Sequence, residues 1–364
     1  MRIVFFMPHL RGGGAERVAV NLARAFTERG HRAQMALSQA EGPYLKDLPP
    51  SVRVIDLRAP RTLSAIPRFA LHLRQERPDA ILAFMLYHNL GALFARWLAR
   101  APARVVLTEH NTLTLSQQDD PNPIARWMPT LMRWFYPMSD AIVAVSHGVA
   151  QDLARYTGIP IEQIRVVYNP VITPLLYRLR DEPTAHPWLE DPSVPVVLAV
   201  GRLTRQKGFD ILLDAFHRVA QVRPARLLIL GEGEDRPLLE AKIARLGLQS
   251  VVQMPGFVQN PYAFMRRASV FVLSSRWEGL PTVLIEALAC GCPVVSTDCP
   301  SGPREILGNG RYGHLVPVGD VDALANAILE VLSGGGKPVP PDWLKQFEES
   351  HVVEQYLSLL RGDL

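Results

Sequence analysis

Cysteine is scarce in this sequence, and the few cysteines lie together. Cys290, Cys292 and Cys299 fall within ten positions of one another. A zinc site would need a fourth ligand and a better spacing. We therefore expect three buried apolar thiols with no metal or redox role.

Long hydrophobic runs are also missing. The longest uncharged apolar stretch covers residues 80–95. It is short of the ~20 residues that a membrane-spanning helix needs, and we interpret it as a strand, a turn and a buried helix. Near the N-terminus only residues 3–7 form an apolar run, which is too short for a signal peptide. These two absences predict a cytoplasmic protein.

Charge of one sign does not dominate the chain, but charge is unevenly distributed. The net charge is +4, and residues 1–170 carry 20 Lys and Arg against 13 Asp and Glu. The remaining residues carry 19 against 22, so they are mildly acidic. A basic first half favours an anionic surface or substrate, although solvated surface charge explains it equally well. The composition, 48% hydrophobic and 20% charged, argues against disorder.

Length and local patterns predict two α/β domains. At 364 residues the chain is about twice the usual domain size. Short apolar, β-rich runs alternate with stretches of helical period, which is typical of parallel strands joined by crossover helices. We predict domains at residues 1–170 and 195–341, a linker rich in proline and charge at 171–194, and a last segment, 342–364, that carries an amphipathic helix over 342–360. Ligands of such sheets bind at the carboxyl ends of the strands, so a ligand between the domains is expected.

A glycine run follows the first expected strand and opens a helix. Gly12, Gly13 and Gly14 would let backbone amides approach a phosphate, and the helix N-terminus favours an anion. A dinucleotide fingerprint would need a further glycine near Arg17 and an acidic residue where Ser38 stands. The run therefore argues against an NAD or FAD enzyme. A flexible strand-to-helix turn stays open as its other interpretation.

Two cations follow the first strand of the second expected domain. Arg202 and Lys207 lie near Gly208, which precedes a helix. An arginine fork and a lysine point charge at the carboxyl end of a parallel strand suit a diphosphate. Solvated surface charge is the alternative, which the flanking glycines disfavour because they allow a ligand to approach closely.

Two carboxylates stand in the apolar segment SSRWEGLPTVLIEALACGCPVV. Glu278 is expected on the loop after a strand at 270–274, and Glu286 on the second turn of a helix at 282–289. Pro281 suits the first turn of that helix, whose free amides could bind an anion. Carboxylates beside these amides can accept hydrogen bonds from sugar or ribose hydroxyls. The alternative for Glu286 is a core carboxylate paired with an arginine.

Two other positions carry groups that could act in a site. His110 follows a strand at 104–108 and should face the same crevice, although a structural histidine is equally expected. Asp320 and Asp322 could hold a divalent metal. A helix at 321–332 favours a capping role for Asp320 instead, so no metal site is expected.

These residues fall in blocks that match a known family. The blocks are GGGAERV (12–18), TEHN (108–111), VVYNP (166–170), GRLTRQKGFD (201–210), LGEGED (230–235) and SSRWEGLPTVLIEALACGCPVVSTD (274–298). On them the chain resembles the glycosyltransferases of family 4 over nearly its whole length. The last block is the most specific, because seven residues separate its two glutamates as in that family.

The resemblance implies the GT-B fold, in which two Rossmann-like domains with parallel sheets face each other and a C-terminal helix crosses back to the N-domain. It implies an enzyme that retains the anomeric configuration and needs no metal or other cofactor. The reaction implied is transfer of a hexose or N-acetylhexosamine from a nucleotide diphosphate sugar, with UDP expected, to a saccharide acceptor.

The family's functional residues carry over to matching positions. Glu278 resembles the carboxylate beside the donor sugar, and Glu286 the one that binds the ribose. Arg202 and Lys207 resemble the pair that neutralises the leaving diphosphate. His110 matches the N-domain histidine near the transferred sugar. The donor-binding set implied in this way further comprises Gly13, Gly14, Gly279, Leu280, Pro281 and Thr282.

The blocks look most like bacterial enzymes that build envelope polysaccharides or lipid-linked oligosaccharides. That resemblance implies a polyprenyl-diphosphate-linked acceptor at the cytoplasmic leaflet, peripheral contact with an anionic membrane surface, and no nucleic-acid partner. Residues 126–138 combine arginines with aromatics and could touch the membrane interface, although a helix buried against the sheet is the alternative. Two other functions stay open: a sugar-nucleotide epimerase of the same fold, and a non-catalytic sugar-nucleotide-binding subunit.

Overall fold

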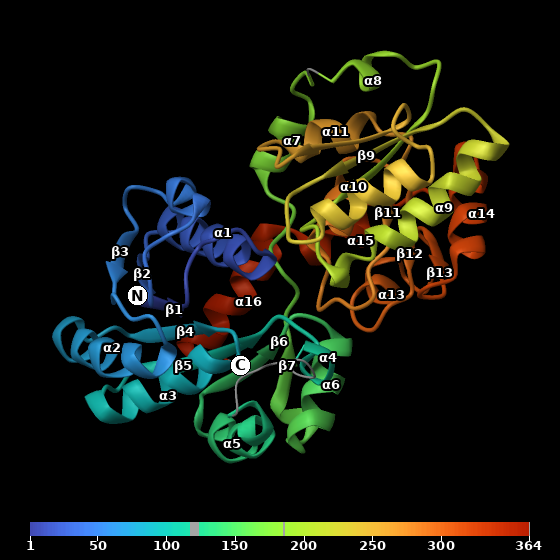
Figure 1. Cartoon of the computed structure of the whole chain (residues 1–364). Coiled ribbons are helices and arrows are strands. Elements are labelled where there is room, and N and C mark those ends of the chain that lie inside the picture. Colours follow the sequence, from blue (N-terminus) through green and yellow to red (C-terminus); the bar gives the residue numbers. More distant parts are fainter. Residues whose placement is uncertain (117–123, 185, 364) are drawn as a thin grey trace. The chain divides into compact units, whose positions relative to one another are not determined.

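The computed structural model describes residues 1–116, 124–184 and 186–363. Its contacts divide the chain into two compact units. The first unit consists of Met1–Pro170 and Gln346–Leu364, and the second of Val171–Lys345. Each unit is an α/β domain built on one parallel sheet, which confirms the predicted fold class (Figure 1).

In the part of the chain that the structure describes, seven parallel strands form the sheet of the first unit, in the order β3-β2-β1-β4-β5-β6-β7. The strands are β1 (Arg2–Met7), β2 (Arg32–Leu37), β3 (Arg53–Asp56), β4 (Ala80–Phe84), β5 (Arg104–Glu109), β6 (Ala141–Ala144) and β7 (Ile164–Val166). The strand order reverses between β1 and β4. Sheets of this kind bind ligands at the carboxyl ends of the strands beside such a reversal.

Helices cover both faces of this sheet because successive side chains of a strand point in opposite directions. On β1, Phe5 packs against Phe26 of α1 with ring centroids 5.8 Å apart, whereas Phe6 stacks on Phe69 of α2 at 4.2 Å. These two helices therefore lie on opposite faces. The helices of this unit are α1 (Gly14–Glu28), α2 (Thr62–Glu76), α3 (Leu86–Ala99), α4 (Leu113–Ser116), α5 (Met128–Phe135), α6 (His147–Thr157) and α16 (Glu349–Arg361).

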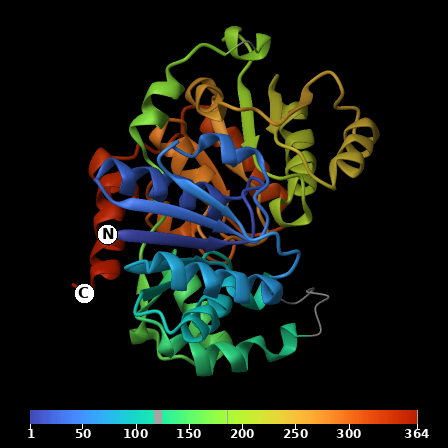
Figure 2. The same cartoon turned by 90° about the vertical axis from the view of Figure 1, so that its left-hand side faces the viewer.

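The last helix, α16, packs beside α1 in the first unit, and Figures 1 and 2 both show it against this sheet. Val352, Val353 and Tyr356 are fully buried and join the core that contains Phe5 and Phe26. The prediction that the C-terminal helix returns to the N-terminal domain is therefore confirmed.

The prediction of one continuous helix over residues 342–360 is wrong. A short helix, α15 (Pro341–Leu344), belongs to the second unit, and α16 begins only at Glu349. Trp343 anchors α15, because its indole N–H donates to the Ile306 carbonyl at 2.8 Å and its ring lies against Tyr312. A 3-10 turn, Lys345–Phe347, and the extended residue Glu348 separate the two helices.

Among the residues of the second unit that the structure describes, six parallel strands form one sheet, in the order β10-β9-β8-β11-β12-β13. The strands are β8 (Val196–Val200), β9 (Arg226–Leu230), β10 (Val252–Gly256), β11 (Val270–Leu273), β12 (Val294–Thr297) and β13 (His314–Val316). The order reverses between β8 and β11. Besides α15 and two short helices described below, the helices of this unit are α9 (Phe209–Val222), α10 (Arg236–Arg245), α11 (Pro261–Arg267), α12 (Thr282–Ala289), α13 (Pro303–Ile306) and α14 (Val321–Leu332).

Residues 171–194, predicted as a linker, fold as part of the second unit. They hold two short helices, α7 (Pro174–Arg180) and α8 (Pro187–Glu190). Both begin at a proline, which is favoured at the first helical position. The Thr173 hydroxyl also caps α7 by accepting from the N–H of Leu176 at 3.2 Å. Two of the prolines that suggested broken structure, Pro174 and Pro187, are therefore helix starts.

Among the helices of the described residues, none has both the length and the hydrophobicity to cross a lipid bilayer. Residues 80–95 instead hold β4 and most of α3, in agreement with the predicted strand, turn and buried helix.

Candidate active site

The loops that follow β8 and β11 are joined by hydrogen bonds. These strands are neighbours and parallel, so both loops start at the same edge of the second sheet. The Ser274 hydroxyl donates to the Lys207 carbonyl at 2.8 Å, and the N–H of Arg276 donates to the Gln206 carbonyl at 2.8 Å. The Gln206 amide in turn donates to the Trp277 carbonyl at 2.9 Å. The two loops therefore form one rigid rim beside the strand reversal.

Lys207 and Glu278 form an ion pair on this rim. The Lys207 ammonium lies 2.7 Å from Oε1 of Glu278, and the Ser275 hydroxyl donates to the same oxygen at 2.6 Å. The side chains are only 16% and 7% exposed, so water screens their attraction weakly. The pair places a cation and a carboxylate together where such sheets bind ligands.

Arg276 fixes the loop that carries Glu278. Its guanidinium donates to both carboxylate oxygens of Asp210, at 2.9 and 2.8 Å, and to the Arg205 carbonyl at 2.7 Å. The hydrogen bonds from the Arg276 guanidinium to Asp210 raise the pKa of this arginine above its usual value. Sequence reasoning missed Arg276 and Asp210 because they are 66 positions apart in the chain, and it also did not single out Ser275, which lies in the same loop as Glu278.

Glu286 lies on the second turn of α12 and is buried, as predicted. The Tyr262 hydroxyl of α11 donates to its Oε1 at 3.5 Å. Pro281 is the N-cap residue of α12 and not part of its first turn. The amides of that first turn have no partner within the helix, which makes the start of α12 favourable for an anion. Gly279, Leu280 and Pro281 are buried just before it, and Thr282 is half-buried.

Arg202 is exposed on the loop after β8, four residues before the paired Gln206. This loop packs against the loop after β9 too closely for a side chain. A Cβ at Gly231 would overlap the Gly201 carbonyl oxygen, and a Cβ at Gly233 would overlap that of Leu203. The two glycines of the LGEGED block therefore hold the Arg202 loop in place.

In the first unit, the glycine run wraps around a buried carboxylate. Gly13 is the N-cap of α1, and a Cβ added there would overlap the carboxylate of Glu16. Oε1 of Glu16 lies 3.6 Å from Nδ1 of His9, and burial lowers the pKa of this histidine. Gly14 has open space where a side chain would be. The sequence did not single out His9 or Glu16, although Glu16 stands in the GGGAERV block.

His110 directly follows β5 and is 8% exposed. Its Nε2 lies 3.1 Å from the Thr108 hydroxyl, and its ring stacks on Phe84 with centroids 5.2 Å apart. Burial lowers the pKa of His110 to about 3, so the imidazole is neutral near pH 7. Its Nδ1 is buried and has no hydrogen-bond partner among the described residues.

A second buried group lies directly before it in the chain. Glu109 accepts hydrogen bonds from the Tyr136 hydroxyl and, at 2.8 Å, from the Asn89 amide. Burial raises the pKa of Glu109 to about 7, although these two hydrogen bonds oppose the rise. This cluster was not predicted, because Asn89 and Tyr136 are far from Glu109 in the sequence.

The remaining predictions concern groups outside these loops. All three cysteines are buried, as expected. The Asp320 carboxylate accepts from the N–H of Ala323 at 2.9 Å and caps α14, which confirms its predicted role, and Asp322 pairs with Arg218. In the described ranges, no cluster of three or more His, Cys, Asp or Glu could hold a metal ion.

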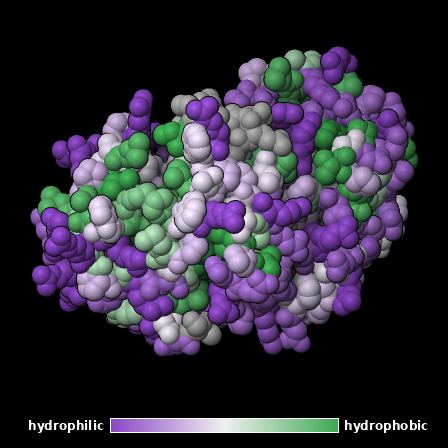
Figure 3. All heavy atoms as spheres, turned by 90° about the horizontal axis from the view of Figure 1, so that it is seen from below, coloured by the Kyte–Doolittle hydropathy of each residue, from purple (hydrophilic) through white to green (hydrophobic). Residues whose placement is uncertain are grey.

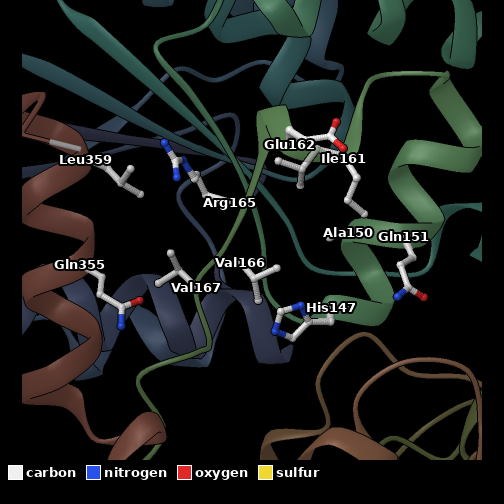
Figure 4. A pocket seen from close by; sticks show the side chains of 11 residues that line it. His147, Ala150, Gln151, Ile161, Glu162, Arg165, Val166, Val167, Gln355 and Leu359 are labelled. Carbon is white, nitrogen blue, oxygen red and sulfur yellow. The ribbon is translucent and has the colours of Figure 1, made fainter.

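A pocket of about 480 Å³ lies in the first unit between α6, β7 and α16. Figure 4 shows His147 and Gln151 from α6, Arg165 from β7 and Gln355 from α16 around it. Of the described residues, none that the sequence predicted for the site lines this pocket. The predicted site residues follow the carboxyl ends of strands instead. Gly13, Gly14 and His110 lie in the first unit, and the other predicted residues lie in the second.

Comparison with known proteins identifies the two units separately. Residues 12–175 match the family model described as Glycosyltransferase Family 4, and residues 194–334 match the one described as Glycosyl transferases group 1. One relative is the N-acetylgalactosamine-N,N'-diacetylbacillosaminyl-diphospho-undecaprenol 4-alpha-N-acetylgalactosaminyltransferase of Campylobacter jejuni. It is 32% identical over 257 residues, which cover 70% of this chain and 67% of that protein.

Two further proteins match over the full length. The lipopolysaccharide core biosynthesis glycosyltransferase LpsE of Rhizobium meliloti is 28% identical over 362 residues, 96% of each chain. The crystal structure of Anabaena HepE in complex with UDP and glucose has the same fold, with a TM-score of 0.79, 21% identity and full coverage of both chains. The chain therefore belongs to family 4 of the glycosyltransferases and has the GT-B fold of two Rossmann-like domains.

Proposed function

We propose that this glycosyltransferase moves a hexose or N-acetylhexosamine from a UDP-sugar to a lipid-linked saccharide, with retention of the anomeric configuration and without a metal. The observation that carries the proposal is the Lys207–Glu278 ion pair on the rim beside the strand reversal of the second sheet. A cation and a carboxylate held together there suit the two ends of the bond that breaks: a departing diphosphate and a sugar that becomes positive.

The diphosphate is the part of the donor that the second unit is built to stabilise. As the bond from the anomeric carbon to the phosphate oxygen breaks, its electron pair goes to the diphosphate. Arg202, Lys207 and the first amides of α12 would hold that developing charge, with Lys207 already fixed by Glu278. These fixed positive groups can do the work that a divalent cation does in metal-dependent transfer, which supports a reaction without a metal.

Glu278 would act on the sugar itself. Its carboxylate accepts from Ser275 and Lys207 at one oxygen, Oε1. A carboxylate can accept hydrogen bonds from sugar hydroxyls and stabilise the oxocarbenium-like sugar of the transition state. In the proposed front-face step, the acceptor oxygen bonds to the anomeric carbon on the side that the diphosphate leaves, and the acceptor proton passes to a phosphate oxygen. A covalent route through Glu278 is the less favoured alternative.

Glu286 and His110 would place the two ends of the donor. Glu286, buried beside Tyr262, would accept from the ribose hydroxyls while the α12 amides hold phosphate. The Nδ1 of His110 could hydrogen-bond a sugar hydroxyl as a neutral group, because burial keeps its pKa near 3. A UDP donor is supported by the HepE structure, which contains UDP and glucose.

The acceptor proposal comes from relatives. The Campylobacter jejuni protein is named as acting on a saccharide linked to diphospho-undecaprenol. By analogy we assign this chain a polyprenyl-diphosphate saccharide in the cytoplasmic leaflet. The basic balance of residues 1–170 agrees with an anionic acceptor or membrane surface.

A transfer assay tests this function. The full chain is incubated with UDP-glucose, UDP-galactose and the corresponding UDP-N-acetylhexosamines, each with and without an undecaprenyl-diphosphate saccharide, in the presence of a chelator. UDP release that requires the acceptor, with an α-linked product from an α-linked donor, is the expected result. Interconversion of UDP-sugars without acceptor would instead support the epimerase, and tight UDP binding with no turnover would support a binding subunit.

A further inference from the structure

Large aromatic side chains are exposed on α3 and around α5 in the first unit. Trp97 is 75% exposed, Trp134 71% and Trp127 57%. Soluble proteins rarely leave several such side chains uncovered together, and larger exposed patches mark interaction sites. Hydrophobic residues near them are also exposed: Phe94, Leu98, Ile124 and Met138.

The exposure follows the helical period, so it forms stripes. Trp127, Trp134 and Met138 are spaced by about two turns and then one turn, which places them on one side of the helical segment. The opposite side, formed by Met128, Met132 and Tyr136, is buried. One side of residues 126–138 is therefore buried within the first unit and the other is uncovered, while contact with a membrane stays a prediction.

The two helices form one surface. Phe94 of α3 packs against Phe135 of α5, with ring centroids 4.9 Å apart. Trp97 and Leu98 lie one turn beyond Phe94 on the same side of α3. Figures 1 and 2 show both helices along the lower side of the first unit, and Figure 3 looks onto that side, where hydrophobic patches alternate with strongly hydrophilic ones. We call this surface the aromatic face.

Within α3 and residues 124–138, every charged side chain is an arginine, and Arg96 pairs with Asp140 beside them. Neither α3 nor residues 124–138 contain an aspartate or a glutamate. Arg100, Arg126 and Arg133 are exposed there, and no carboxylate of the described residues lies within ion-pair distance of them. The Arg126 guanidinium lies 5.7 Å from the centre of the Trp127 ring. Tryptophan interleaved with unpaired arginine is the composition of surfaces that enter the headgroup region of a membrane.

We propose that the aromatic face docks the protein on an anionic phospholipid bilayer. The tryptophan rings would insert at the level of the headgroups, and Arg100, Arg126 and Arg133 would attract anionic lipid. This assignment rests on the proposed function only for its purpose, since a lipid-linked acceptor lies in such a bilayer. The binding itself needs neither donor nor acceptor.

Vesicle sedimentation with the full chain tests the proposal. The vesicles are made of phosphatidylcholine alone or of phosphatidylcholine with phosphatidylglycerol, and contain no polyprenyl lipid. We expect binding to the anionic vesicles that weakens as salt rises, and at least about tenfold weaker binding to the neutral ones. Trp97→Ser with Trp134→Ser should reduce anionic binding about tenfold or more, and Arg126→Glu with Arg133→Glu should do the same.

Matched variants of the second unit serve as controls. Val222→Ser removes a side chain that is 68% exposed, and Arg245→Glu reverses an exposed charge on α10. Both should bind vesicles as the unsubstituted protein does. The aromatic-face variants should keep their thermal unfolding midpoint and their rate with a water-soluble acceptor, because none of the substituted side chains is in the candidate site.

Three outcomes would overturn the assignment. Equal binding to neutral and anionic vesicles would remove the role of the arginines. Binding that survives both double substitutions would place the contact elsewhere. A protein dimer that the tryptophan substitutions convert to monomer would assign the face to a second copy of the chain. An inactive enzyme that still binds anionic vesicles through this face would contradict the transfer function alone.

Discussion

The two sheets end in regions that handle charge in opposite ways. At the strand ends of the second sheet, Lys207 and Glu278 form an ion pair, with Nζ and Oε1 2.7 Å apart. At those of the first sheet, Glu109 and His110 are buried, and burial moves both groups toward their neutral forms. Pairing preserves ions, whereas burial without a countercharge removes them. The groups that can stabilise a departing diphosphate are therefore concentrated in the second unit.

Of the substitutions that test this comparison, Glu278→Gln should have the largest effect on sugar transfer. The substitution keeps the shape and an acceptor for Ser275 but removes the negative charge beside the sugar. We expect sugar transfer to fall about 10²-fold to 10³-fold, while UDP binding changes little. Steady-state kinetics and calorimetry with UDP measure both. Glu330→Gln, at a side chain that is 61% exposed, is the control, and a tenfold or greater loss in that variant would make the comparison uninformative about Glu278.

Removing the cations should have the next largest effect. Lys207→Met and Arg202→Ala should each lower the transfer rate about 10-fold to 10²-fold and weaken UDP binding, since each removes a charge that we propose faces the diphosphate. Lys207→Met also removes the cation that pairs with the buried Glu278 carboxylate, so it should be less stable than Arg202→Ala by about 1 to 3 kcal/mol in urea unfolding. Glu278→Gln combined with Lys207→Met should recover part of that stability. Strict additivity of the two stability changes would contradict the pairing.

Glu109→Gln tests the other half of the comparison, the buried carboxyl group of the first unit, through the pH dependence of stability. The pKa of Glu109 is raised from its ordinary 4.5 to about 7 in the folded protein. A raised pKa means that the folded state holds a proton that the unfolded state releases, so stability is lost as pH rises from about 4.5 to about 7. The glutamine variant does not suffer this loss. It should gain about 1 to 3 kcal/mol over the unsubstituted protein on going from pH 5 to pH 8, measured by urea unfolding. An equal difference at both pH values would mean that Glu109 is ionised in the fold.

His110→Gln should have the smallest effect on transfer. Because the pKa of His110 is lowered to about 3, the side chain would act as a neutral hydrogen-bonding group. We expect the rate to fall about threefold to tenfold, with the shape of the pH-rate profile between about pH 5 and pH 8 unchanged. A limb of the profile that disappears in the variant would show that the imidazole titrates during turnover.

Much of the fold followed from the sequence because local patterns matched tertiary structure. Helix α12 was predicted at Thr282–Ala289, and the glutamates were assigned to a loop and a helix, as found. The alternation of apolar runs and helical stretches was enough to predict two parallel sheets. Strand β7, which has only the three residues Ile164–Val166, was not predicted.

The missed parts of the site depend on contacts between distant segments. Arg276 follows β11, but its partner Asp210 lies beyond β8, and only the neighbouring positions of β8 and β11 bring the two residues together. Glu109 was not predicted as part of a polar cluster, because its hydrogen-bond donors, Asn89 and Tyr136, are distant from it in the sequence. The prolines of residues 171–194 suggested a linker, although two of them start helices.

A crystal structure of the protein with bound UDP tests the central claim most directly. The account predicts the diphosphate within hydrogen-bonding distance of Arg202, Lys207 and the first amides of α12, and the ribose hydroxyls at Glu286. UDP bound instead in the pocket between α6, β7 and α16, with Lys207 and Glu278 untouched, would contradict it.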